Sequence, residues 1–218
     1  MLIHEKGPFV RGSILLISFL VLFCVLLTPV MRDEKGNHLT GLQYADNVFN
    51  ELSKGSSYFI PSVREHVKTV EKVNVKVTVT MKKADLAETA VQVLTKAGMT
   101  ASADGAKVTY EGNLAAMLNA ATTDADSLYH NDAETVTARY DGTHALKAAA
   151  AWWYVLSPSI KELQKQRLIA EAQVVDQVLR RAVEPGNNFY SVEPVKVSDH
   201  IWLMSGILYC YGVHRDLH

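Results

Sequence analysis

A continuous apolar run near the N-terminus constrains this chain more than any other feature. Residues 13–31 form a stretch of 19 residues without a charge, which as an α-helix would be about 28 Å long, close to the thickness of a bilayer core. A cleavable signal peptide has a shorter apolar stretch, roughly 7 to 15 residues, followed by small residues, whereas Pro29 and Arg32 stand at the end of this run. The run therefore predicts an uncleaved transmembrane signal anchor over residues 13–31.

The charges beside this anchor do not fix its orientation. Positive side chains lie on both sides of it, at Lys6, Arg11, Arg32 and Lys35. The positive-inside rule therefore gives a tie. Only residues 1–12 precede the anchor, while the long hydrophilic part follows it. We therefore expect a short cytoplasmic N-terminus, an anchor in the cell inner membrane and a main domain on the exported, periplasmic side.

The overall composition excludes several classes of protein. The chain has 218 residues, of which 48% are hydrophobic and 21% charged, a composition typical of folded chains and not of disordered ones. Its 22 basic and 23 acidic residues give a net charge of −1, without the basic excess that nucleic-acid binding needs. The two cysteines, Cys24 and Cys210, lie in apolar runs, so we expect neither a disulfide framework nor a nucleic-acid partner.

The middle of the chain alternates between strand and helix patterns. It follows a stalk or linker over residues 32–68, in which residues 39–53 have helical spacing. Apolar and polar side chains alternate over residues 73–81, which is the period of a half-buried strand. Residues 86–97 have helical spacing and stop at Gly98, which suits a helix C-terminus. The sequence therefore predicts a strand followed by a helix.

Two further strands and a second helix complete this pattern. Asp104 and Gly105 favour a tight hairpin turn between strands at residues 99–103 and 106–111. Asn113 is a good N-cap for a helix that extends to residue 128, and the alternation of residues 135–140 predicts a fourth strand. The order βαββαβ is the ferredoxin-like pattern. We therefore predict an α+β chain with a small ferredoxin-like domain over residues 69–141, a fold that does not identify an activity.

Residues 142–199 form a predicted helical region with a cluster of aromatic residues. Trp152 and Trp153 suit either a membrane interface or a core in which each indole N–H has a partner. Ser157 and Pro158 are a plausible N-cap and first-turn pair, and predict the start of a long helix that ends at residues 184–186. Its polar faces offer a surface for a partner or for packing on the small domain.

The C-terminal segment, residues 200–218, is predicted as an apolar terminal helix. Its 13 uncharged residues, 201–213, reach only about 20 Å as a helix, which is short for a bilayer. One interpretation is a second transmembrane segment, with Trp202 at an interface and Gly206 in close helix packing. The other is an amphipathic or buried helix. The chain would accordingly cross the membrane once or twice.

The histidines beside this segment are the best candidates for contact with a cofactor or metal. His200 and His214 lie at its two ends, and Cys210, His214 and His218 have i,i+4 spacing, which could bring three ligands to one helical face. The sequence places no acidic residue to orient those imidazoles. We therefore expect no metal site and no resident cofactor.

The carboxylates of the middle region do not predict catalysis either. Asp124 and Asp126, like Asp132 and Glu134, lie near a helix end or a strand entry, where a solvated surface is the better interpretation because catalytic carboxylates need a cleft. The middle region also has no phosphate-binding glycine loop and no nucleophile motif. We expect the chain not to be an enzyme.

We predict a noncatalytic, membrane-anchored subunit of a bacterial-type envelope complex, whose exported domain contacts other subunits. The layout of residues 13–140 resembles in outline the inner-membrane assembly proteins of type IV pili and type II secretion systems, which join a signal anchor and a helical stalk to a ferredoxin-like domain. The alternative is an accessory subunit of a membrane redox or transport complex, with the C-terminal helix among other transmembrane helices. The candidate interaction residues are Trp152, Trp153, Trp202, Gly206, His200 and His214.

Overall fold

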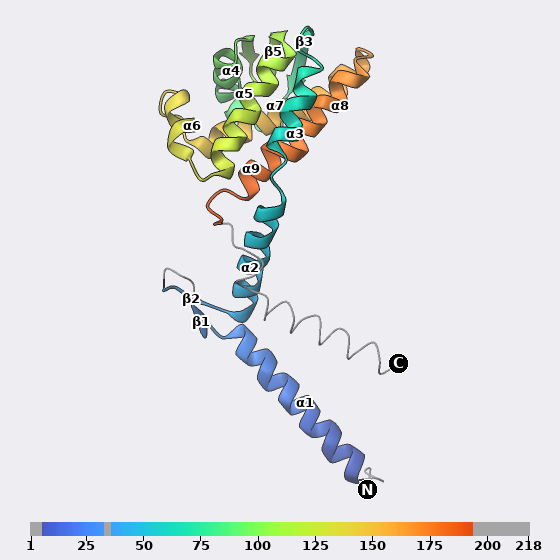
Figure 1. The fold of residues 1–218 in the computed structure, drawn as a ribbon, viewed down its shortest axis with the longest axis vertical. Coiled ribbons are helices and arrows are strands. Elements are labelled where there is room, and N and C mark those ends of the chain that lie inside the picture. The colour runs from blue at the N-terminus through green and yellow to red at the C-terminus, as the bar shows by residue number, and fades with distance from the viewer. Residues whose placement is uncertain (1–5, 33–35, 194–218) are drawn as a thin grey trace. The chain divides into compact units, whose positions relative to one another are not determined.

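The computed structural model describes residues 6–32 and 36–193, which belong to two compact units of mixed helix and antiparallel sheet (Figure 1). The first unit contains the N-terminal elements as far as Ser53, and the second begins at Lys54. The expected combination of helices with antiparallel strands is confirmed. The predicted terminal helix over residues 200–218 lies outside the described residues.

The first helix, α1 (Lys6–Leu27), contains most of the apolar run, but it begins before the predicted start at residue 13 and ends before the predicted end at residue 31. Its stretch of 21 residues from Gly7 to Leu27 is long and apolar enough as a whole to cross a membrane, and these side chains are not buried. In the part of the chain that the structure describes, no other helix has this character. A membrane anchor and an N-terminal signal sequence share these properties. The helix stops two residues before Pro29, whose ring nitrogen has no hydrogen to donate.

A short hairpin and a second helix follow α1. β1 (Met31–Arg32) pairs antiparallel with β2 (His38–Leu39), and α2 (Gly41–Ser56) then begins with a capping box. In this box Gln43 N donates to Thr40 Oγ1 (3.2 Å), and Thr40 N donates to Gln43 Oε1 (2.9 Å). The helical spacing seen in residues 39–53 is therefore confirmed as a helix with a defined start.

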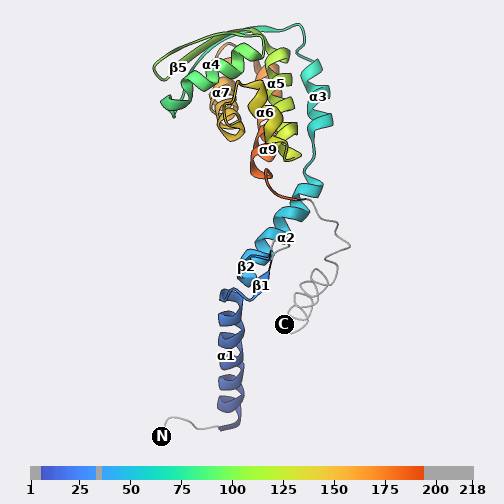
Figure 2. The ribbon, with the colours of Figure 1, turned by 90° about the vertical axis from the view of Figure 1, so that its left-hand side faces the viewer.

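The second unit is built on a sheet of three strands. β3 (Asn74–Thr80), β4 (Thr100–Asp104) and β5 (Lys107–Asn113) have the order β3-β5-β4, and both pairings are antiparallel. β3 and β4 are therefore parallel to each other, with β5 between them, as in a split βαβ unit. Figure 2 shows the end of the second unit at which β5 lies, with α4, α5 and α7 next to the sheet. The alternation predicted for the first strand is confirmed, because the valines at positions 75, 77 and 79 are buried and the residues between them are exposed.

The helix between β3 and β4 ends as its sequence predicts. A short 3₁₀ turn, η1 (Ala84–Leu86), leads into α4 (Ala87–Lys96). Gly98 has a positive φ of 84°, and Met99 N donates to Leu94 O at 3.0 Å, which is the hydrogen bond of a Schellman C-cap. The hairpin turn lies one residue later than expected, at Gly105 and Ala106, because Asp104 pairs with Lys107.

The second helix of the pattern is confirmed, but the predicted fourth strand is wrong. α5 (Leu114–Tyr129) is capped by Asn113, whose Oδ1 accepts from Ala116 N at 2.9 Å. Residues 135–140 do not form a strand, because α6 (Ala133–Arg139) occupies this stretch. Asp132 starts α6 by accepting from Thr135 N at 3.1 Å. The ferredoxin-like fold, which needs a fourth strand, is not confirmed.

The C-terminal helices also differ from the prediction. α7 (Ala145–Lys165) continues through Pro158, where a helix start was expected, and it ends where Arg167 adopts a φ of +65°. α8 (Ile169–Val178), a π-helical turn, η2 (Leu179–Val183), and α9 (Glu184–Asn188) follow. The predicted single long helix is therefore interrupted after Lys165, and its residues belong to the end of α7, to α8 and to η2. Buried residues lie on both sides of Pro158 in the same helix. A proline inside a helix costs about 3 kcal/mol of stability, and the burial of this continuous apolar face offsets that cost.

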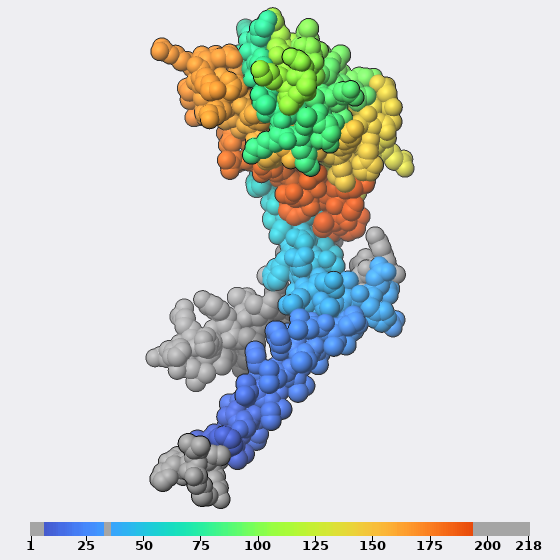
Figure 3. Space-filling view, turned by 180° about the vertical axis from the view of Figure 1, so that it is seen from behind, coloured from blue at the N-terminus to red at the C-terminus, as the bar shows by residue number. Residues whose placement is uncertain are grey.

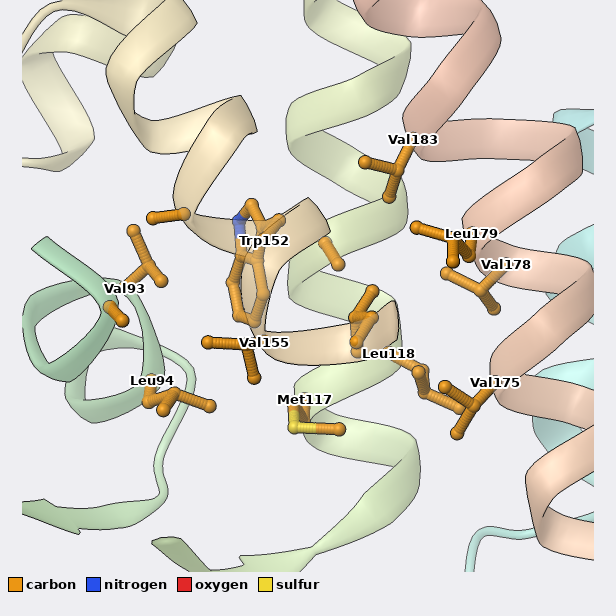
Figure 4. Close-up of a cluster of buried hydrophobic side chains, with 14 of the residues drawn as sticks. Val93, Leu94, Met117, Leu118, Trp152, Val155, Val175, Val178, Leu179 and Val183 are labelled. Atoms are coloured by element: carbon orange, nitrogen blue, oxygen red, sulfur yellow. The ribbon is translucent and has the colours of Figure 1, made fainter. Parts of the chain in front are cut away.

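One hydrophobic core unites the sheet with helices from both ends of the second unit. α3 (Ile60–Lys68), which the sequence does not predict, buries one apolar face in this core. Figure 4 shows Trp152 of α7 beside Val93 of α4 and Leu118 of α5. Residues of the predicted linker, of the predicted small domain and of the predicted helical region therefore share one core.

We predict that Val77→Asp unfolds the second unit. Val77 is 1% exposed, and an unpaired buried carboxylate should lower the free energy of unfolding by about 3 kcal/mol or more. Urea unfolding of the full-length chain in detergent micelles, followed by near-ultraviolet circular dichroism, measures this loss. Thr80→Asp on the exposed face of the same strand is the control and should cost less than about 1 kcal/mol. Equal stability of the two variants would contradict the strand assignment.

A buried hydrogen bond joins the sheet to α7. Ser159 Oγ donates to Val155 O (2.6 Å) and accepts from Tyr110 Oη (2.7 Å). Burial raises the pKa of Tyr110 to about 12, although its hydrogen bond to Ser159 acts in the opposite direction. The folded state therefore holds the phenol proton more tightly than the unfolded state, whose tyrosines titrate near pH ~10.

This difference predicts a loss of stability in alkaline solution. The contribution of Tyr110 is complete below pH ~10 and is lost as the pH rises towards ~12, where the unfolded state binds fewer protons. Tyr110→Phe cannot ionise, so its free energy of unfolding should fall less over this range, by about 2 kcal/mol. Urea unfolding at a series of pH values measures the fall. Ser159→Ala retains the phenol, so its free energy of unfolding should fall with pH as that of the parent does. If the parent and Tyr110→Phe lost the same free energy of unfolding over this pH range, the loss could not be attributed to Tyr110.

Candidate functional site

A surface groove runs between α7 and the segment from α8 to α9. It consists of three adjoining pockets with volumes of about 420, 510 and 410 Å³. Trp153 and Glu184 line both the first and the second pocket, and Ile160 is one of the residues shared by the second and the third. We call this surface the α7–α9 groove. Volumes of this size are typical of ligand sites in proteins.

The first pocket combines a small apolar floor with aromatic and polar walls. Its lining residues are Ala149, Ala150, Trp153, Tyr154, Val183, Glu184, Asn187 and Asn188. Trp153 Nε1 donates to Glu184 Oε1 at 3.2 Å, and the rings of Trp153 and Tyr154 meet edge to face with their centroids 5.0 Å apart. This pocket therefore holds a carboxylate against an aromatic pair.

Two backbone features position α9 beside this pocket. The π-helical turn η2 immediately precedes Glu184, and π-helical turns inside helices are frequent at functional sites. Gly186 then packs directly on α5, because a Cβ atom at this position would lie 2.6 Å from Ala125 O. Figure 3 shows residues of α9, in red, at the surface of the second unit. The carboxylate of Glu184 is therefore carried by a closely packed element.

The other two pockets are more polar. Arg180 Nε donates to Asp176 Oδ1 at 2.8 Å, and both residues line these pockets together with Gln164. Gln177 lines the third pocket, and its Oε1 is a buried side-chain atom without a hydrogen-bond partner among the described residues. This end of the groove thus has an ion pair and an available acceptor.

The structure separates the two tryptophans that the sequence singled out. Trp152 is 1% exposed and belongs to the core, whereas Trp153 lines the groove. The other candidates, Trp202, Gly206, His200 and His214, lie outside the described residues, as does the i,i+4 set of Cys210, His214 and His218. In the described ranges 6–32 and 36–193, no group of three or more metal-ligating residues is present.

The interpretation of Asp124 as solvated surface is wrong. This carboxylate is 1% exposed and accepts hydrogen bonds from Trp152 Nε1 (2.7 Å), from the Tyr140 hydroxyl and from Arg139 Nη1. Burial raises the pKa of Tyr140, while Trp152 and the charge of Arg139 oppose this rise. The network joins α5, α6 and α7. A sequence signal existed, because Asp124 follows Ala121 by three residues on the apolar face of α5.

Asp126, two residues further on, lies nearer the surface and binds three neighbours. It accepts from Tyr58 Oη (3.0 Å) and pairs with Arg64 Nη2 (3.3 Å) and His130 Nδ1 (3.2 Å). Burial raises the pKa of Tyr58, and the hydrogen bond to Asp126 adds to this effect. The cluster links the segment before α3 to the C-terminal end of α5.

Lys54 is a further polar residue that the sequence does not single out. Its Nζ donates to Phe189 O (3.1 Å), to Asn131 Oδ1 (3.3 Å) and to Val192 O. Burial lowers the pKa of Lys54, and the charge of Glu193 opposes this shift. The lysine therefore ties the start of the second unit to its last described residues.

We predict that Asp124→Asn destabilises the chain much more than Asp126→Asn. An asparagine at position 124 would be uncharged and would turn its own N–H donors towards Trp152, Tyr140 and Arg139. Breaking such a buried pair costs about 3 kcal/mol, whereas the more exposed substitution should cost less than about 1 kcal/mol. Urea unfolding of both full-length variants measures the difference. Comparable losses for the two variants would contradict a structural role for the buried carboxylate.

Comparisons of this chain with models of protein families, with curated proteins and with solved structures find no match. The interpretation of the groove therefore depends on its own residues.

Proposed function

We propose that this chain is a membrane-anchored, noncatalytic subunit of a bacterial-type envelope complex, and that its second unit contacts partner proteins through the α7–α9 groove. The observation that carries the proposal is the combination of α1 with a unit that has its own core. α1 supplies a 21-residue stretch from Gly7 to Leu27 that is long and apolar enough to cross a membrane and is not buried, which suits insertion in a bilayer. The second unit needs no lipid to bury its apolar residues.

The state of the carboxylates supports a binding role over a catalytic one. Glu184 is hydrogen-bonded to Trp153, and Asp176 is paired with Arg180. Asp124 is surrounded by donors from three residues. A general acid or base needs a proton that it can exchange with a substrate, whereas these groups stabilise neighbouring elements and shape the groove.

The proposed direction of insertion is that of a signal anchor followed by an exported domain, because the compact second unit comes after α1 in the chain. In our proposal the N-terminus is cytoplasmic, α1 crosses the inner membrane, and the second unit lies on the periplasmic side, where it meets other subunits of the complex.

The proposal predicts a membrane-bound, uncleaved chain that is recovered with a partner in fixed proportion. The test uses the full-length chain with a C-terminal tag, isolated from its native membrane in mild detergent. Intact-mass measurement reports whether the recovered chain has the full 24.1 kDa in addition to the mass of the tag. Quantitative mass spectrometry identifies the accompanying proteins. The chain should stay in the membrane fraction after alkaline carbonate extraction, because α1 is inserted.

A matched pair of variants locates the contact. Asn188→Arg places a bulky charge in the groove and should reduce recovery of the partner by tenfold or more. Asn119→Arg makes the same change at an exposed position of α5 outside the groove and should leave recovery unchanged. A soluble chain that has lost its N-terminal residues would show that α1 is a cleaved signal sequence, and a chain recovered alone would disprove the subunit role.

A further inference from the structure

The first pocket of the α7–α9 groove has the chemistry of a cation-binding site. Among the residues that line it, Glu184 is the only charged one, and the carboxamides of Asn187 and Asn188 add oxygen acceptors. Trp153 and Tyr154 supply aromatic faces, which attract cations through the ring quadrupole. The lining therefore offers negative charge, acceptors and aromatic surface to one ligand.

The chain itself uses one ring of this aromatic pair to bind an ammonium group. Lys83 Nζ lies 5.7 Å from the centroid of the Tyr154 ring, within the range of a cation–π contact. Trp153 is the stronger platform of the two, because indole has the larger cation–π energy. Its hydrogen bond to Glu184 holds the carboxylate beside the indole, and a carboxylate can accept several further hydrogen bonds.

The positively charged side chains that line the groove do not line this pocket. Lys161 lines the second pocket, and Arg180 lines the second and third, where it is paired with Asp176 at 2.8 Å. The small side chains of Ala149 and Ala150 leave the floor of the first pocket open, with a volume of about 420 Å³. A planar cation that stacks on an indole and bonds a carboxylate in two places fits these walls, and arginine is the side chain with those properties.

We propose that this pocket binds an arginine side chain of a partner polypeptide. The guanidinium group stacks on Trp153 and donates to Glu184, while its carbon chain lies over the two alanines. The groove favours a polypeptide because it continues along α7 from Ala149 to Gln164, about 22 Å as a helix, which accommodates an extended segment of roughly six residues. This assignment of the partner rests on the proposed function.

Nuclear magnetic resonance of the full-length chain in detergent micelles tests the pocket. The chain is labelled with ¹⁵N-tryptophan, and Trp153→Phe assigns the indole N–H signal of Trp153. The probes are N-acetyl-arginine amide and its uncharged analogue N-acetyl-citrulline amide. The arginine probe should shift the Trp153 signal in a saturable manner, and the citrulline probe should bind at least tenfold more weakly, because it lacks the charge.

A matched pair of variants tests the role of the carboxylate. Glu184→Gln retains an oxygen that accepts from Trp153 but removes the charge, and it should weaken binding of the arginine probe at least tenfold. Glu88→Gln makes the same change at an exposed position of α4 outside the pocket and should leave binding unchanged. The proposal would be overturned if the parent bound the two probes with equal affinity or if the Trp153 signal did not shift. It would also be overturned if Glu184→Gln bound the arginine probe as tightly as the parent does.

A peptide probe distinguishes the two sources of a guanidinium group. The uncharged flanks of N-acetyl-Gly-Gly-Arg-Gly-Gly-amide should strengthen binding severalfold over the single amino-acid amide if the groove accepts a polypeptide. Equal affinity would assign the pocket to a small guanidinium compound and overturn the polypeptide part of the proposal. If the pocket binds no arginine probe but a partner is still recovered from the membrane in fixed proportion, the subunit role stands and the arginine proposal is overturned.

Discussion

The second unit depends on the burial of α7, because this helix packs on the sheet and on the other helices at the same time. Trp152 and Leu163 of α7 are buried in the shared core, and each large apolar side chain contributes on the order of 2–3 kcal/mol. Two hydrogen bonds then specify how α7 lies, one from Tyr110 to Ser159 and one from Trp152 to Asp124. Both are buried, where a lost partner is costly.

The same helix determines the chemistry of the groove. Trp152 and Trp153 are adjacent in sequence, and successive residues of an α-helix are about 100° apart around its axis. One indole therefore enters the core, where it donates to Asp124, and the other lies in the groove, where it donates to Glu184. The first carboxylate is enclosed and serves stability. The second lines an open pocket and is available to a ligand.

Local patterns predicted β3, the end of α4 at Gly98 and the start of α5, but they failed where one pattern fits two structures. Val136 and Tyr140 are four residues apart, so a strand and a helix over residues 135–140 would each bury both of them. The two structures differ at Ala138, which a strand would bury with them and which is exposed, as the helix requires. For the candidate site, Trp153 was an expected interaction residue. Glu184 was not, because it reaches Trp153 across 31 positions of sequence.

The sequence by itself determined the apolar helix α1, most of the secondary structure of the sheet and which faces of α4 and α5 are buried. These features depend on side-chain periodicity and on caps that act within about four residues. Only the tertiary structure decided that α7 continues through Pro158, that Asp124 is buried and that a groove opens beside Trp153. The donors to Asp124 are 15, 16 and 28 positions away, so its environment exists only after α5, α6 and α7 have packed together.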